Sequence, residues 1–184
     1  MSTITKPDIT PGTWAFDPSH SEIGFSVRHL MVSKVKGRFG TFDGSISIAE
    51  QPLESSVNVS VDMSSIDTRD ENRDAHLRSP DFFETDKYPT MTFVSTEVRP
   101  EGDGYVVVGD LSIHGVTKPI ELAVEFNGVG SDPWGGKRVG FSAEGEVSRK
   151  EWGIDIDMPL ESGGVVVGDK IKLQLEVEAV LQGD

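Results

Sequence analysis

Histidines are the residues of this sequence best suited to move a proton, because an imidazole titrates near neutral pH. The chain has four histidines and no cysteine, which excludes a thiolate nucleophile, a disulfide and a cysteine-bound metal. His29 continues the alternation of Ile23, Phe25 and Val27, and this parity turns its ring inward or toward a rim. There it would meet a polar head group or form an internal hydrogen bond, and both interpretations stay open.

Asp74 and His76 are a second place to look for acid–base chemistry. Two positions apart on a predicted helix, they point to different sides and make a weak catalytic pair. We therefore expect no catalytic residue, no metal ion and no cofactor. The alternative is an enzyme that uses His29 or this pair on a lipid-like substrate.

Arginines are the natural partners of a phosphate group, because the guanidinium can bind it with two parallel hydrogen bonds. Arg69, Arg73 and Arg78 fall on one short predicted helix and are the candidates for holding a ligand's head group. Nearby acids such as Asp70 offer surface ion pairing as the alternative use.

A two-residue alternation of apolar and polar side chains recurs along most of the chain and predicts β-strands. These strands are the elements that must position the residues named above. Turn sequences such as Asn127-Gly128 separate the alternating runs and favour antiparallel hairpins. Between 35 and 48 the apolar positions change from odd to even, which predicts a bulge near Gly40 or Gly44. The clearest alternating runs are 23–27, 57–63, 107–113, 120–126, 139–147 and 171–179.

One segment has no strand pattern. Thr68 and Glu71 have the spacing of a capping box, which predicts a short helix from about Arg69 to Arg78, with Pro80 ending it. Its apolar face is thin, so we expect it to cap one end of the molecule. Many strands around one short helix predict an all-β fold. We favour an antiparallel β-barrel of about eight strands over a sandwich, because closure removes exposed edges.

Composition narrows the function classes. A formal net charge of -14 argues against a nucleic-acid partner, because phosphate backbones would be repelled. The sequence shows no signal peptide and no apolar run long enough to span a bilayer, so we expect a cytoplasmic protein without stable membrane insertion. We expect a flexible segment over 1–12 and a single domain over 13–184, and exposed edges or a rim contact would permit a homodimer.

A set of ordered motifs extends the interpretation beyond patterning. From about Trp14 to Leu181 the chain resembles the YceI family. The resemblance implies an extended lipocalin-like barrel whose interior accepts polyisoprenoid chains, such as those of isoprenoid quinones or prenyl diphosphates. The motifs that carry it are Asp17-Pro18-Ser19-His20-Ser21, His29, Val35-Lys36-Gly37-Arg38-Phe39, Ser65-Ile66-Asp67-Thr68, Arg73-Asp74-Ala75-His76-Leu77-Arg78-Ser79-Pro80-Asp81-Phe82-Phe83, Lys87-Tyr88-Pro89-Thr90 and Gly109-Asp110-Leu111-Ser112-Ile113-His114-Gly115-Val116-Thr117-Lys118-Pro119.

The expected function is binding of a polyisoprenoid or similar amphiphilic lipid inside the barrel, as a carrier, storage or sensor protein. A small barrel enzyme acting on a lipid-like substrate is the alternative, and a solidly filled structural barrel is a third reading. The predicted ligand-binding residues are inward-facing or near the helix: Phe25, Val27, His29, Phe39, Val59, Val61, Leu77, Phe82, Phe93, Phe141, Leu173 and Leu175.

Overall fold

The computed structural model describes residues 9–29, 33–154 and 167–183. Strands dominate them, with a single α-helix and four short 3₁₀ segments among these residues. The elements are β1 Gly12–Phe16, η1 Pro18–His20, β2 Glu22–His29, β3 Ser33–Phe39, β4 Phe42–Ile48, η2 Pro52–Glu54, β5 Ser56–Asp62, η3 Met63–Ser65, β6 Ile66–Asp67, α1 Glu71–Arg78, β7 Thr90–Glu101, β8 Gly104–Ile113, β9 Val116–Ser131, β10 Lys137–Ser148, η4 Arg149–Trp152 and β11 Val167–Gln182.

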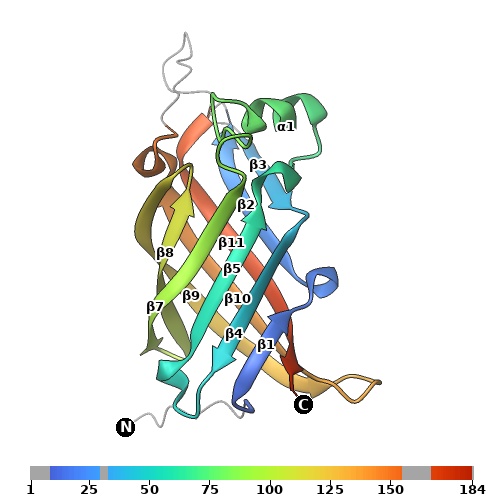
Figure 1. Cartoon of the computed structure of the whole chain (residues 1–184). Helices are drawn as coiled ribbons and strands as arrows, with labels where there is room; N and C mark the ends of the chain where they lie inside the picture. Colours follow the sequence, from blue (N-terminus) through green and yellow to red (C-terminus); the bar gives the residue numbers. More distant parts are fainter. Residues whose placement is uncertain (1–8, 30–32, 155–166, 184) are drawn as a thin grey trace.

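The sheet closes on itself, so the fold is a barrel and not a sandwich. Eight strands follow one another around the ring in the order β1, β4, β5, β7, β8, β9, β10 and β11, and β11 pairs back onto β1. The closing pair is antiparallel and brings Thr13 opposite Gln182 and Phe16 opposite Ala179. β11 is long enough to pair with β2 beyond β1, and β2 continues through β3 to β6. The predicted antiparallel barrel is confirmed (Figure 1).

The change of parity between 35 and 48 has a simple structural cause. β3 ends at Phe39 and β4 begins at Phe42, so Gly40 and Thr41 form a bend between two strands. The Gly40 N–H donates to the Ser65 carbonyl, and the Thr41 carbonyl accepts from the Asp62 N–H. Two non-strand residues shift the phase of the alternation, so both Phe39 and Phe42 are buried in the core.

Helix α1 starts later than the capping box predicted, and Thr68 is not its cap. Asp70 is the N-cap, and its carboxylate accepts from the Arg73 N–H. Arg69 has a φ of 67°, a left-handed conformation that separates Thr68 from the helix. Thr68 is instead buried and donates its hydroxyl and its N–H to the Asp74 carboxylate.

The two ends of the barrel differ in packing. We call the end that carries α1 the helix end, and the end that carries η2 and the β9–β10 connection the η2 end (Figure 1). The helix end is filled by side chains that are almost inaccessible, including Met63 at 2%, Ile66 at 1% and Trp152 at 1% exposure. This end therefore contains a solid apolar core.

The described residues contain no helix that combines the length and apolarity needed to cross a bilayer.

Candidate ligand-binding site

A cavity of about 200 Å³ lies inside the barrel and extends from beneath the helix-end core to the η2 end. Some inward positions of its wall remain half-buried, as for Val57, Val59 and Ile48, although Trp14 on β1 at the same end is fully buried. The described residues that line it are Ile9, Phe16, Ile23, Gly24, Phe39, Ile46, Ile48, Ala49, Pro52, Ser55, Ser56, Val57, Val59, Val61, Met91, Phe93, Val98, Tyr105, Val107, Leu111, Ile120, Leu122, Val124, Phe126, Phe141, Ala143, Leu173, Leu175 and Val177.

Most of the predicted ligand-binding residues on the strands line this cavity. They come from strands far apart in sequence, which alternate inward positions around the ring. The ones that the structure brings together are Phe39, Val59, Val61, Phe93, Phe141, Leu173 and Leu175.

Of the other five predicted residues, four lie away from the lining and the side chain of the fifth is not described. Phe25 packs its ring against Phe39, with centroids 5.6 Å apart, and covers Gly37, where a side chain would collide with the ring. Val27 lies farther along β2 toward the helix end, opposite Val35. Leu77 and Phe82 join the solid core of the helix end, Phe82 with 6% exposure. His29 is the last residue of β2, and its side chain lies outside what the structure describes.

The three arginines proposed for a head group do not face the cavity. Arg73 donates from Nε to the Thr68 hydroxyl and from Nη2 to the Thr68 carbonyl, both at 2.7 Å. Arg78 donates to the carbonyls of Ser64 and Ile66, and Arg69 is exposed. None of the three is among the described residues of the lining. Arg73 and Arg78 hold α1 on the barrel, and a head group at the helix end is not supported by this geometry.

Three residues of the lining carry hydroxyl groups. These are Ser55 and Ser56 at the start of β5 and Tyr105 on β8, all half-buried. The Ser55 hydroxyl also accepts from the Ala49 N–H at 3.0 Å. We missed these residues because our prediction followed apolar positions only. For Ser55 the sequence did contain a signal, because the inward run of Val57, Val59 and Val61 extends backward to it with the same parity.

Ile9 also reaches the cavity, although the sequence placed it in a flexible segment. The indole Nε1 of Trp14 donates to the Thr10 carbonyl at 3.1 Å, and Lys137 Nζ donates to the Thr10 hydroxyl at 3.1 Å. These two bonds hold the chain across the η2 end, next to the base of the β9–β10 hairpin.

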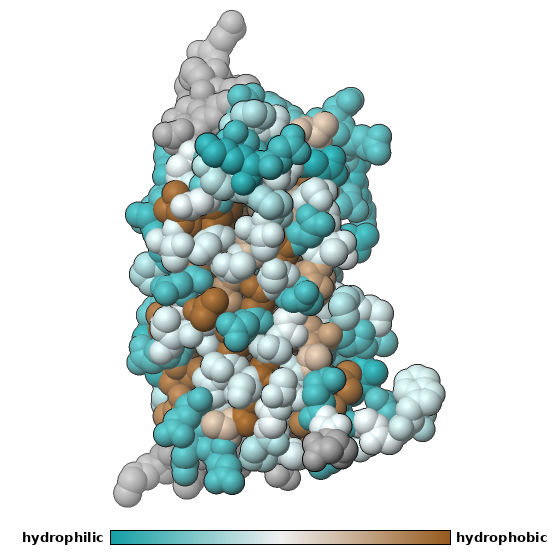
Figure 2. Space-filling view, in the orientation of Figure 1, coloured by the Kyte–Doolittle hydropathy of each residue, from teal (hydrophilic) through white to brown (hydrophobic). Residues whose placement is uncertain are grey.

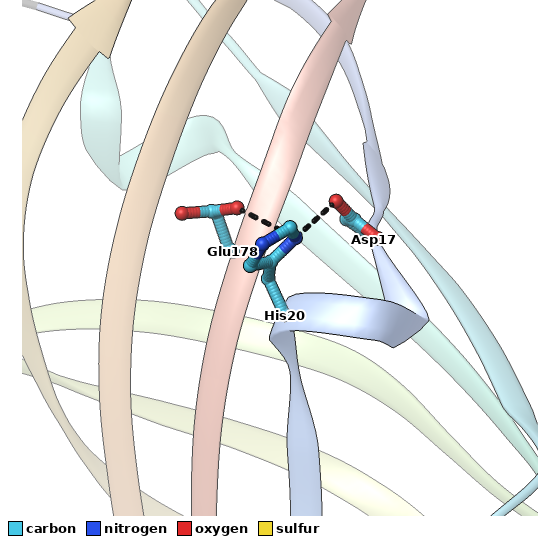
Figure 3. Close-up of side chains that lie close together, drawn as sticks. All are labelled: Asp17, His20 and Glu178. Atoms are coloured by element: carbon cyan, nitrogen blue, oxygen red, sulfur yellow. Dashed lines mark hydrogen bonds and ion pairs between the residues drawn. The ribbon is translucent and has the colours of Figure 1, made fainter. Parts of the chain in front are cut away.

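A polar cluster on the barrel surface is the other chemically notable group (Figure 3). His20 Nδ1 lies 2.8 Å from Asp17 Oδ2 and 3.5 Å from Glu178 Oε2. Arg138 Nη1 contacts the same two oxygens, at 2.7 Å and 2.8 Å, and Arg138 Nε lies 3.1 Å from Asp132 Oδ2. The guanidinium therefore already bridges the carboxylates that a metal ion would bind, and we interpret the cluster as an ion-pair network.

Hydrogen bonds from Ser19, Arg138 and His20 hold the pKa of Asp17 well below its usual range. Hydrogen bonds to the carboxylates of Asp17, Asp132 and Glu178 raise the pKa of Arg138, with Asp17 as the largest cause. The network ties together the η1 region, the β9–β10 turn and β11, so it stabilises the seam where β1 closes onto β11.

The remaining candidates for acid–base chemistry are separated. The Asp74 carboxylate is buried against Thr68, whereas His76 Nε2 lies 2.9 Å from the exposed Asp81 Oδ2. His114 closes the β8–β9 turn with a φ of 56°, and its Nδ1 lies 3.2 Å from the Trp152 carbonyl. These contacts are structural, and the two members of the predicted pair do not meet.

Comparison with known proteins places the chain in a family. A YceI-like domain model matches residues 14–179. Protein YceI of Escherichia coli is 42% identical over 164 residues, which cover 89% of this chain and 83% of the relative. A UPF0312 protein of Photorhabdus laumondii is 49% identical over 140 residues, which cover 76% of this chain and 73% of the relative.

Solved structures share the barrel. The YCEI protein of Campylobacter jejuni has a TM-score of 0.71 at 31% identity, covering 85% of this chain and 90% of that one. A polyisoprenoid binding domain from Saccharophagus degradans has a TM-score of 0.69 at 15% identity, covering 94% of this chain and all of that one, and shows the fold alone. With the motifs, the closed barrel and these matches in agreement, the chain belongs to the family of proteins with a YceI-like domain.

Proposed function

We propose that the barrel binds the hydrocarbon tail of an uncharged isoprenoid amphiphile, such as an isoprenoid quinone, and acts as its carrier or store. The observation that carries this proposal is the cavity, which is walled almost entirely by apolar side chains. Two comparisons support it: membership of the YceI-like family, and a fold shared with the polyisoprenoid binding domain of Saccharophagus degradans.

Burial of the tail supplies enough free energy without any catalytic group. Removal of one CH₂ from water contributes about 0.8 kcal/mol, so a five-carbon unit contributes roughly 4 kcal/mol before association costs. The cavity of about 200 Å³ is larger than the ~150 Å³ void that holds one benzene molecule. It therefore admits at least one such unit in this conformation, and a longer tail would displace side chains such as the paired rings of Phe126 and Phe141.

The lining favours an uncharged head group over a diphosphate. The described wall offers the hydroxyls of Ser55, Ser56 and Tyr105 and no lysine, arginine or histidine. A diphosphate placed there would lose its hydration without gaining a cationic partner, and that loss is costly. The net charge of -14 adds a long-range repulsion for an anionic ligand.

We infer a binding role rather than a catalytic one. General acid–base catalysis needs the acting side chain within hydrogen-bond reach of the bound substrate. The Asp74 carboxylate accepts a hydrogen bond from Thr68, and His76 contacts Asp81 on the surface at the helix end. Both lie outside the described lining of the cavity.

The test compares two ligands of equal tail length on the full chain after its bound lipid has been stripped. Geranylgeraniol should bind at one saturable site by titration calorimetry, and geranylgeranyl diphosphate at least about tenfold more weakly, because the cavity wall cannot pair its charge. Equal affinity for the two would refute the uncharged head group. Absence of saturable binding of either ligand would refute the proposed function itself.

A further inference from the structure

Trp134 is the most exposed large apolar side chain of the described residues, at 84% exposure. It lies at the tip of the β9–β10 hairpin, which projects from the η2 end of the barrel (Figure 1). Over the face shown in Figure 2, hydrophobic residues form small patches that are separated by hydrophilic and intermediate ones. At this exposure the whole indole is available for contact with another surface, and its position at a projecting tip places it ahead of the rest of this end.

The turn that presents Trp134 is built rigidly. The Asp132 carboxylate accepts from the N–H groups of Trp134 at 2.9 Å and of Gly136 at 2.7 Å. Its other oxygen accepts from Arg138 Nε at 3.1 Å, and Arg138 is in turn fixed by Asp17. An ordered turn loses little conformational entropy when its tip binds, so the indole is preorganised for contact.

The base of the hairpin contacts a segment that reaches the cavity. Lys137, at the base of β10, donates to Thr10, and the neighbouring Ile9 lines the cavity. Across the same end, η2 contributes Pro52 to the lining and exposes Leu53 at 48%. Two exposed apolar side chains thus stand at the end of the barrel to which the cavity extends.

Charge selects the kind of surface that this end would meet. The protein carries a net charge of -14, but the segment 126–137 contains one acid, Asp132, and one base, Lys137. The Asp132 carboxylate is moreover paired with Arg138. The hairpin is therefore nearly neutral, whereas the exposed Leu53 lies between two glutamates, Glu50 and Glu54, so this end would be repelled by an anionic lipid surface but not by a zwitterionic one.

We propose that the η2 end docks on a zwitterionic bilayer surface, with Trp134 inserted at the level of the lipid head groups and Leu53 as a second contact. Indole rings favour that level, because one edge is apolar and the other donates a hydrogen bond. The docking gives an isoprenoid tail a route between bilayer and cavity that avoids water, and in this respect it rests on the proposed function.

The experiment titrates the full chain with vesicles of dioleoylphosphatidylcholine and follows tryptophan fluorescence and co-sedimentation. Of the three tryptophans, Trp14 and Trp152 are buried at 0% and 1% exposure, so a blue shift reports on Trp134. We expect the wild type to shift and sediment. Trp134→Ser should lose about tenfold in vesicle affinity, because the buried apolar area of the indole is gone.

Val94→Ser is the matched control, because Val94 is an exposed apolar residue on the outer wall of β7, at 47% exposure. It should sediment like the wild type, and Leu53→Ser should weaken binding less than Trp134→Ser does. An unshifted wild-type spectrum, or equal vesicle binding by Trp134→Ser, would overturn the docking. So would a wild-type dimer that Trp134→Ser dissociates, since the indole would then serve a second copy of the chain.

Cavity loading is measured separately, by calorimetric titration of geranylgeraniol without vesicles. Loading that persists in Trp134→Ser alongside lost vesicle binding supports the docking as a separate property. Vesicle binding that depends on Trp134 in a chain that takes up no geranylgeraniol would instead leave the docking in place and refute the proposed cargo.

Discussion

At the scale of single residues, charged groups in this protein serve structure and apolar groups form the site. Arg138 contacts three carboxylates, and Arg73 and Arg78 bond to Thr68 and to backbone carbonyls. The cavity, by contrast, is formed by inward valines, leucines and phenylalanines. The residues whose types first invited a chemical interpretation are therefore not the ones that would hold a ligand.

Asp17→Asn should destabilise the protein at neutral pH by about 1–2 kcal/mol, because it removes a charged acceptor of the Arg138 network. The folded-state pKa of Asp17 lies below its unfolded value of about 3.9, so its stabilising contribution is complete above that value. It is lost as pH falls toward the folded-state pKa. Urea unfolding at pH 6 and at pH 3 should show a smaller acid-induced loss in the variant.

The matched control is Asp103→Asn, which changes an exposed carboxylate in the turn between β7 and β8. Its free energy of unfolding at pH 6 should stay within about 0.5 kcal/mol of the wild type. An acid profile of Asp17→Asn identical to that of the wild type would show that the network contributes nothing to the pH dependence.

Val59→Phe should fill the cavity and reduce the affinity for geranylgeraniol by about tenfold or more, because the added ring takes space needed by the tail. Filling an existing void should leave the melting temperature within a few degrees of the wild type, whereas the same change in a packed core would cost about 1–3 kcal/mol. Val94→Phe, which enlarges an outward side chain of β7, should bind normally. Undiminished binding by Val59→Phe would place the ligand elsewhere.

At the scale of elements, α1 packs on the solid core of the helix end and does not control access to the cavity. Its buried contacts run through Thr68, Asp74 and Arg73, and the core beneath it includes Met63 and Phe82. The hairpin β9–β10 and the 3₁₀ turn η2 belong instead to the end to which the cavity extends.

Removal of the positive charge of Arg69, just before α1, and of Arg78, its last residue, should therefore leave ligand affinity unchanged. Arg69→Gln and Arg78→Gln, singly and combined, should bind geranylgeraniol within about twofold of the wild type, because neither side chain lines the cavity. Thr68→Ala should lower stability by about 1–3 kcal/mol, since it leaves part of the buried Asp74 carboxylate unsatisfied. Titration calorimetry measures the affinities and chemical unfolding measures the stability. A large loss of affinity in the arginine variants would indicate that the head group binds at the helix end.

At the scale of the whole molecule, one barrel combines a solidly packed helix end with a cavity that extends to the η2 end. The packed end, with Trp152, Met63 and Ile66 nearly inaccessible, stabilises the fold while the cavity stays available. Closure through the β1–β11 pair removes sheet edges that would otherwise invite aggregation.

Binding should raise the thermal stability of the whole barrel through mass action. With geranylgeraniol free at one hundred times its dissociation constant, the gain is about 2.7 kcal/mol, which corresponds to roughly 5–11 °C for a chain of this size. Differential scanning calorimetry of wild type and Val59→Phe, each with and without the ligand, measures it. A shift of equal size in both proteins would mean that the ligand binds outside the cavity.

The sequence by itself determined the strands, because alternation of side-chain polarity has the same period as the strand. From the runs 57–63 and 171–179, for example, it correctly assigned Val59, Val61, Leu173 and Leu175 to the inside. The short helix was also predictable, although Thr68 proved to bind Asp74 while Asp70 caps the helix. The positive φ of Arg69 that separates Thr68 from α1 has no sequence signal as clear as a glycine.

Only the tertiary structure decided which part of the barrel interior is hollow. Alternation gives the face of a residue, but not its height along the barrel axis, because that height depends on the tilt and stagger of strands paired far apart in sequence. Phe25 and Phe93 were both expected to face the interior, yet only Phe93 lines the cavity, because the ring of Phe25 lies over Gly37, where no side chain occupies the space. Side chains that face each other across the barrel either fill the interior or leave a void, depending on their total volume. Which side chains face each other is fixed only when strands far apart in sequence pair and close the barrel.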